Sequence, residues 1–169
     1  MPLLKIELLG SDVLRRHADP VPAPGPGFDT LIADMFETMY DAKGIGLAAP
    51  QVGISQRLVV VDVNDEGGKA LGPMALFNPR VVEAGPQTDK AEEGCLSIPG
   101  VSGVVERPWR VVVEAEDREG RPVRIEAEDM LARCLQHEID HLDGVLFIDR
   151  MSPLKRNMVL RKYRKQAST

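Results

Sequence analysis

The stretch Asp129-Met-Leu-Ala-Arg-Cys-Leu-Gln-His-Glu-Ile-Asp-His-Leu142 predicts the element around which this chain folds. Its apolar side chains recur at helical spacing, and Gly144 follows at the position of a glycine C-cap. Because the helix is largely apolar, we expect it to be buried with strands on its flanks. It also carries His137 and His141, two of the three histidines in the chain. Residues four apart share a helix face, so the two imidazoles should point the same way.

Two imidazoles on one helix face can converge on a metal ion, and the Glu138 carboxylate beside them can act as a general base. Zinc proteases with this pattern usually take a third ligand from a downstream Glu or His. Beyond His141 this chain has neither, only Asp143 and Asp149. We therefore expect the third ligand upstream.

The upstream candidates are His17, Cys95, Cys134 and many carboxylates. His17 stands in a polar stretch and is expected to be exposed. Cys134 is on the same helix as the histidines, where three adjacent ligands would give awkward tetrahedral geometry. Cys95 has a better setting, because Gly94 permits a close backbone approach. A thiolate there would leave one metal position open, as in catalytic sites. Either cysteine could instead be a small buried apolar residue.

The segment Gly44-Ile-Gly-Leu-Ala-Ala-Pro-Gln-Val-Gly53 is rich in small residues that allow a backbone to approach a ligand closely. It lacks the Lys-Ser/Thr ending of a phosphate-binding loop. Gln51 offers an uncharged amide donor that suits an oxyanion. The alternative is an ordinary glycine-rich turn.

The composition is that of an ordinary globular domain, with 43% apolar and 28% charged residues among 169. No apolar run approaches the ~20 residues of a membrane span, and the N-terminus lacks the features of a signal or transit peptide. The two cysteines do not suggest a disulfide-stapled fold. We expect a cytoplasmic protein that acts on neither membranes nor DNA.

The net charge of −5 is unevenly distributed. Residues 150–169 carry +7 with no acidic side chain, so residues 1–149 carry −12. A basic tail on an acidic body predicts an anionic partner for the tail. The alternative is a solvated helix face.

Periodicity and turn residues predict an α+β fold in a single domain spanning 1–169. Mixed or mainly antiparallel β-sheets should pack around the central metal-binding helix, with further helices near the N- and C-termini. A hairpin is expected at Glu119-Gly120 and a turn at 65–72. The expected helices are 28–40, 129–142 and 153–166, and the expected strands are 58–63, 74–77, 80–84, 110–115 and 123–127.

Three motifs carry a resemblance to a known family. They are Gly44-Ile-Gly-Leu-Ala-Ala-Pro-Gln51, Glu93-Gly-Cys-Leu-Ser97 and Gln136-His-Glu-Ile-Asp-His141. In this order and approximate spacing they resemble peptide deformylases, in the shorter bacterial-type form with a C-terminal helix. Two other readings are a different His-Glu-x-x-His amidase or peptidase and a non-catalytic binding module of the same fold.

The resemblance implies a hydrolase that removes the formyl group from N-formylmethionine of nascent peptides. It implies one divalent metal ion, Fe²⁺ in the cell, while Zn²⁺, Ni²⁺ or Co²⁺ would also suit the ligands. It also implies ribosome docking through the basic C-terminal helix. The implied metal ligands are Cys95, His137 and His141, the implied acid/base is Glu138, and the implied oxyanion donors are Gln51 and the Leu96 N–H.

The resemblance also assigns a substrate pocket. Gly46 would lie at the substrate, and Ile45, Glu93, Cys134 and His137 would line the methionine pocket. Arg107 is the matching candidate for an arginine that holds Glu93. Two residues depart from the pattern. Arg133 stands where some members have an apolar pocket residue, so its head is expected to turn outward or cap the rim, and Ser102 replaces an arginine or bulky residue.

Overall fold

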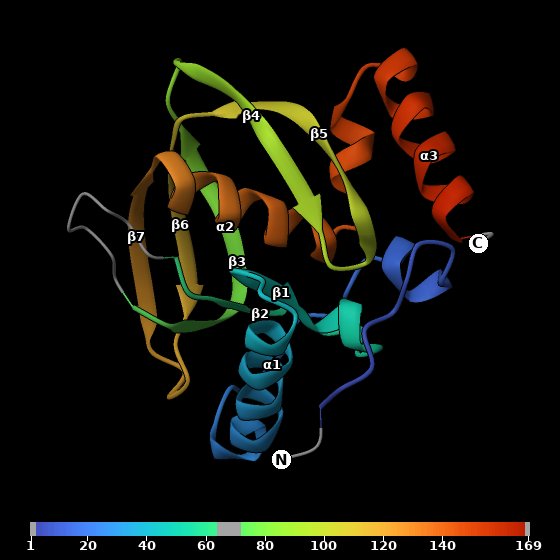
Figure 1. Ribbon diagram of the computed structural model, residues 1–169. Coiled ribbons are helices and arrows are strands. Elements are labelled where there is room, and N and C mark those ends of the chain that lie inside the picture. The colour runs from blue at the N-terminus through green and yellow to red at the C-terminus, as the bar shows by residue number, and fades with distance from the viewer. Residues whose placement is uncertain (1–2, 64–71, 168–169) are drawn as a thin grey trace.

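The computed structural model describes residues 3–63 and 72–167. Its central element is helix α2 (Asp129–Leu142), with the predicted bounds and with every residue from Ala132 to Leu142 buried. Figure 1 shows α2 crossing between a large sheet and the hairpin formed by β4 and β5. The predicted buried helix with strands on its flanks is confirmed.

Among the described residues, seven strands form two antiparallel sheets. Five of them pair in the order β1-β2-β3-β6-β7, and β4 pairs with β5 alone. The hairpin expected at Glu119-Gly120 joins β6 to β7. The α+β single-domain fold with antiparallel sheets is therefore confirmed. The strands are β1 (Gly46–Ala48), β2 (Leu58–Val61), β3 (Met74–Ala84), β4 (Thr88–Cys95), β5 (Ile98–Pro108), β6 (Arg110–Glu116) and β7 (Pro122–Glu128).

The strand predictions differ from the structure in four places, of which two are brief: β1 was not predicted, and the strand predicted at 58–63 ends at Val61. The strands expected at 74–77 and 80–84 are the single strand β3, whose pairing with β6 is irregular between Phe77 and Arg80. Asn78, at this irregularity, has a φ of 51°. The long hairpin of β4 and β5 lies where the sequence predicts no strand. The turn expected at 65–72 lies, except for Gly72, outside the described residues.

Two further helices cover the sheets. Helix α1 (Asp29–Asp41) packs Ile32, Met35 and Met39 into a core shared with β1, β2 and β3. Helix α3 (Pro153–Ala167) packs on β5 and buries Val159 and Leu160. Within residues 3–63 and 72–167, no helix is long and apolar enough to cross a membrane. Helix α2 contacts strands of both sheets, and it carries two of the residues of the candidate site.

Candidate active site

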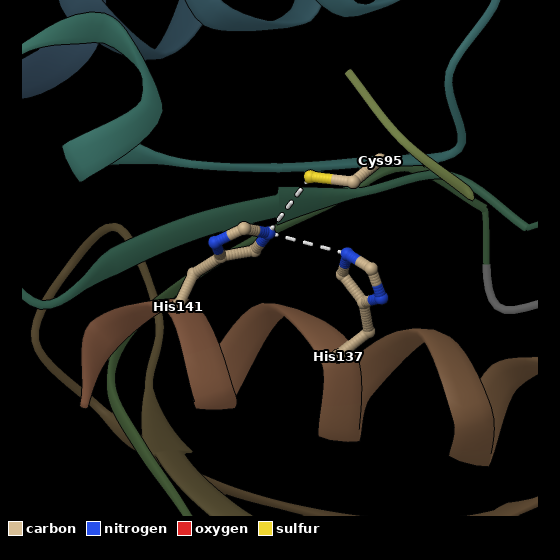
Figure 2. A group of neighbouring side chains, drawn as sticks. All are labelled: Cys95, His137 and His141. Carbon is tan, nitrogen blue, oxygen red and sulfur yellow. Dashed lines mark hydrogen bonds between the residues drawn. The ribbon is translucent and has the colours of Figure 1, made fainter. Parts of the chain in front are cut away.

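Cys95 comes from the end of β4 and faces His137 and His141 on α2 (Figure 2). Their potential ligand atoms all lie within 4.8 Å of one another. The Cys95 sulfur is 3.4 Å from His141 Nε2, which is 3.2 Å from His137 Nε2. The thiol of Cys134, the alternative ligand, instead lies 3.7 Å from the Ile45 carbonyl oxygen. His17 is exposed, as expected, and lies 3.3 Å from Asp143.

These spacings fit a tetrahedral metal ion. Ordinary metal–nitrogen and metal–sulfur bond lengths at tetrahedral angles place two nitrogens about 3.3 Å apart and a sulfur about 3.6 Å from a nitrogen. The observed 3.2 and 3.4 Å are close to both values. Two imidazole nitrogens facing each other repel through their lone pairs unless a proton or a cation lies between them. The donor set therefore suits one divalent metal with an open fourth position.

Glu138 is buried beside this metal site, with 4% of its surface exposed. Its Oε1 has no hydrogen-bond partner among the described residues. Burial raises the pKa of Glu138 to about 7, although the neighbouring His137 opposes the shift. A carboxyl group that exchanges its proton near neutrality is suited to general acid–base work.

Gly46 on β1 allows this arrangement. A Cβ at this position would stand 2.6 Å from Glu138 Oε2 and 2.9 Å from Cys134 Sγ. Any side chain here would push on the buried carboxylate or the thiol. The glycine-rich segment is thus more than an ordinary turn, because it forms strand β1 against α2.

Gln51 lies in the single turn Ala49–Val52 and is buried. Its Oε1 accepts a hydrogen bond from the Ala48 N–H at 3.0 Å. Its Nε2 donates to Ser97 Oγ at 3.1 Å and lies 3.6 Å from Cys95 Sγ. The amide nitrogen therefore faces the ligand cluster, as an oxyanion donor must.

A cavity of about 620 Å³ joins these groups. Of the residues predicted from the sequence, it is lined by Ile45, Gly46, Gln51, Glu93, Cys95, Leu96, Cys134, His137 and Glu138. Two predicted site residues, Arg107 and His141, are not among its lining residues. The lining also includes Val101 and Met130, which no motif had indicated.

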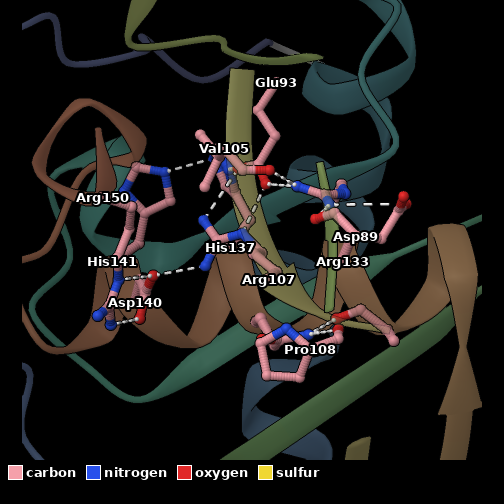
Figure 3. Close-up of polar contacts among 12 residues, drawn as sticks. Asp89, Glu93, Val105, Arg107, Pro108, Arg133, His137, Asp140, His141 and Arg150 are labelled. Atoms are coloured by element: carbon pink, nitrogen blue, oxygen red, sulfur yellow. Dashed lines mark hydrogen bonds and ion pairs between the residues drawn. The ribbon is translucent and has the colours of Figure 1, made fainter. Parts of the chain in front are cut away.

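Arg107 lies behind the cavity and holds Glu93. Its Nε and Nη2 donate to the two Glu93 oxygens at 2.5 and 2.9 Å, and Glu93 Oε1 lies 2.9 Å from His137 Nδ1 (Figure 3). Burial alone would raise the pKa of Glu93, but the hydrogen bonds with His137 and Arg107 lower it to about 2. Glu93 is thus a permanent carboxylate that orients a metal-ligating ring.

Sequence reasoning missed the continuation of this network. Arg107 Nη1 donates to Asp140 at 2.9 Å, and Arg150 Nη2 donates to the other oxygen of Asp140 at 2.8 Å. Asp140 follows His137 by three residues, so helical spacing could have placed the two on one side of α2. No sequence signal marked Arg150 as its partner.

The expectation that Arg133 turns outward or caps the pocket rim is wrong. Only 7% of Arg133 is exposed, and it lines the cavity. Its guanidinium donates to Glu93 Oε2 at 2.6 Å and to the backbone oxygens of Val105 and Asp89 at 2.9 and 2.8 Å. A buried carboxylate and two carbonyl groups solvate the cation, which removes the usual reason for an arginine to reach water.

Comparison with known proteins agrees with this geometry. The family described as polypeptide deformylase matches residues 3–157. A peptide deformylase of Rhizobium meliloti is 50% identical over 169 residues, which covers 100% of this chain and 97% of the relative. A peptide deformylase structure from Ehrlichia chaffeensis in complex with actinonin superimposes with a TM-score of 0.92 at 38% identity, covering 100% of both chains. One from Legionella pneumophila gives 0.88 at 47% identity, covering 99% of this chain and 96% of the other. The chain belongs to the polypeptide deformylase family.

Proposed function

We propose that this chain hydrolyses the formamide bond of N-formylmethionine at the start of new polypeptides and releases formate. One observation carries the proposal. Cys95, His137, the buried Glu138 carboxyl and the Gln51 amide line one cavity, and His141 completes the Cys-His-His set. A non-catalytic module of the same fold would not need the metal ligands, the buried carboxyl or the amide donor. Another kind of amidase would not need all three sequence motifs.

Each group has a distinct part in the reaction. A divalent metal, when bound, lowers the pKa of water toward neutrality and polarises a carbonyl group. Glu138 accepts the proton of the attacking water and delivers it to the departing amine nitrogen as the C–N bond breaks. Gln51 Nε2 and the Leu96 N–H donate to the carbonyl oxygen while it carries negative charge. One such donor is typically worth about 3 kcal/mol.

We propose that the space at the reacting carbonyl, beside Glu138, is too small for an acyl substituent. The backbone of Gly46 packs tightly against Glu138 and Cys134, which leave no room for a side chain at that position. A formyl group carries only hydrogen on its carbonyl carbon, whereas an acetyl group carries a methyl. We therefore propose strong preference for formyl over acetyl, and a softer preference for methionine through Ile45 and Cys134.

The deciding experiment compares formyl-Met and acetyl-Met peptides on the same preparation. Formate release with little or no acetate release supports the proposal. Comparable rates for the two peptides would refute it, because the reacting centre would then tolerate an acyl substituent.

The proposed native metal is Fe²⁺, on the family resemblance. The ligands themselves also suit Zn²⁺, Ni²⁺ and Co²⁺. Anaerobic purification with metal analysis and a formate assay on one sample tests the assignment. Activity that tracks zinc content and is indifferent to oxygen would contradict it.

We also propose that α3 docks on the ribosome in the cytoplasm. Helix α3 buries Val159, while Leu154 and Met158 are 74% and 62% exposed. Exposed apolar residues among basic ones suit an RNA-rich surface, and phosphate contacts would make binding fall steeply with salt. Sedimentation with ribosomes at rising salt tests this. Salt-insensitive binding, or unchanged binding without residues 153–169, would refute it.

A further inference from the structure

Arg133 is a buried cation in the wall of the substrate cavity. It stands on α2 next to Cys134 and one helical turn before His137, and it lines the cavity together with both residues and Glu93. Its three hydrogen bonds run to β4 and β5, so one guanidinium joins the central helix to the hairpin that carries Cys95.

Glu93 receives two arginines at once (Figure 3). Arg107 binds both carboxylate oxygens from behind, and Arg133 binds Oε2 at 2.6 Å from the side of the cavity. The remaining contact of Glu93 is the one to His137 Nδ1 at 2.9 Å. With Oε2 held by two donors, the carboxylate plane is fixed, and so is the oxygen that orients the His137 ring.

We propose that Arg133 is a positioning and specificity-determining residue, which aligns His137 through Glu93 and sets the inner limit of the pocket for the first side chain of the substrate. The pocket role rests on the proposed function, because Glu93, Cys134 and His137 are the residues assigned to the methionine pocket. The positioning role does not, because it concerns the metal ligand itself.

Removal of the guanidinium has two separable effects. Glu93 Oε2 keeps a single donor, and the Val105 and Asp89 carbonyl groups lose theirs. Loss of such an outer partner of a metal ligand typically lowers metal affinity or activity about 10- to 100-fold. The space vacated by a long side chain also deepens the cavity, so larger first residues should gain relative to methionine.

The variants Arg133→Met, Arg133→Ala and Arg133→Lys distinguish these effects. Met keeps the unbranched stem without donors, and Ala also removes the volume. Lys keeps the charge, but its ammonium cannot reproduce the planar fork that reaches three acceptors. Arg124→Met is the matched control, since the Arg124 side chain is 53% exposed on β7 and its ion pairs with described residues are to surface glutamates.

The first measurement is metal affinity, by chelator competition with Co²⁺ on folded protein whose circular dichroism matches the wild type. Arg133→Met should bind Co²⁺ about 10-fold more weakly or worse, with partial recovery in Arg133→Lys and no change in Arg124→Met. Wild-type Co²⁺ affinity in a folded Arg133→Met would overturn the positioning role. If Arg133→Met does not fold, Arg133→Lys with wild-type affinity does the same.

The second measurement is kcat/KM for formyl-Met, formyl-norleucine and formyl-Phe peptides. Arg133→Ala should raise the Phe-to-Met ratio at least about 5-fold, mainly through KM. A merely structural defect would lower all three in proportion, so an unchanged ratio would overturn the specificity role. If the proposed function is wrong, the wild type will release no formate from these peptides. The Co²⁺ measurement does not depend on that outcome.

Discussion

The close contact at Gly46 gives the sharpest test of how the site is built. An alanine Cβ at this position would lie 2.6 Å from Glu138 Oε2, 3.0 Å from Glu138 Cδ and 2.9 Å from Cys134 Sγ. Ordinary carbon–oxygen and carbon–sulfur contacts need about 3.3 and 3.7 Å, so one or both groups must move by roughly 0.7 Å. The backbone of Gly46 does not have a positive φ, so Gly46→Ala is a test of space and not of backbone strain.

The expected cost falls on catalysis more than on folding. Overpacking a buried position by one methyl group costs about 1–3 kcal/mol of stability. A shift of roughly 0.7 Å in Glu138, the proposed general base, should lower kcat/KM about 100-fold, since displacements of about 1 Å can have that effect. This corresponds to about 2.7 kcal/mol in transition-state free energy. The three atoms nearest to the added methyl belong to Glu138 and Cys134 and not to a metal ligand, so bound metal should remain.

The assay combines formate release, metal content and thermal unfolding of Gly46→Ala. Gly85→Ala is the control, because its Cβ would meet Arg110 at an ordinary 3.5 Å outside the cavity. Activity within about threefold of wild type in Gly46→Ala would refute the crowding of Glu138. Full recovery in the double variant Gly46→Ala/Cys134→Ala would also refute it, because the sulfur and not the carboxylate would then be the obstacle.

Three further predictions concern other residues. Glu138→Ala should retain one metal ion per chain by elemental analysis while turnover falls about 10²- to 10⁴-fold, and retained turnover would remove its role. Gln51→Leu should lower kcat about 100-fold at unchanged metal content, because it loses one oxyanion donor, and an effect on KM alone would argue for ground-state binding instead. The third prediction concerns Asp149. Burial alone would raise the pKa of Asp149, but hydrogen bonds from Arg15 and the Leu146 N–H lower it below its ordinary value of 3.8. A carboxyl group whose pKa is lowered on folding stabilises the folded state at pH values above its ordinary pKa, and this contribution is lost as pH falls through the folded pKa. The Tm difference between wild type and Asp149→Asn should therefore shrink below about pH 4.

The sequence predicted α2 to the residue because its signals are local. Apolar spacing, helix-forming residues and Gly144 all act within the same short stretch. The hairpin of β4 and β5 carries no such signal. Residues such as Lys90, Glu92 and Gly94 are disfavoured in strands, and pairing with β5 overrides that preference. These strands form because the two neighbouring segments pair with each other, which the residue types of neither segment indicate.

The site residues also differ in how well the neighbouring sequence indicates their role. Cys95, His137 and Glu138 could be proposed from residue type and spacing, because a metal site needs those groups. Arg133 could not, since an arginine next to Cys134 has no local feature that distinguishes a buried position from an exposed one. Its burial depends on Glu93 and on two backbone oxygens of other strands.

Four buried charges and the exposed Arg150 form one alternating series, Arg150–Asp140–Arg107–Glu93–Arg133, with contacts of 2.8, 2.9, 2.9 and 2.6 Å. Burying any one of the four alone would be costly, and the series is tolerable because each inner member touches two opposite charges. Removal of an arginine at either end of the series leaves one carboxylate short of a donor. Loss of Arg107 would remove a hydrogen-bond donor from both carboxylates at once. Since Glu93 orients His137, the order of the series also ranks its members by their influence on the metal ligand. Arg107 stands at the centre of the series, and Arg133 directly contacts Glu93, the partner of His137. Arg150 acts only through Asp140 and Arg107.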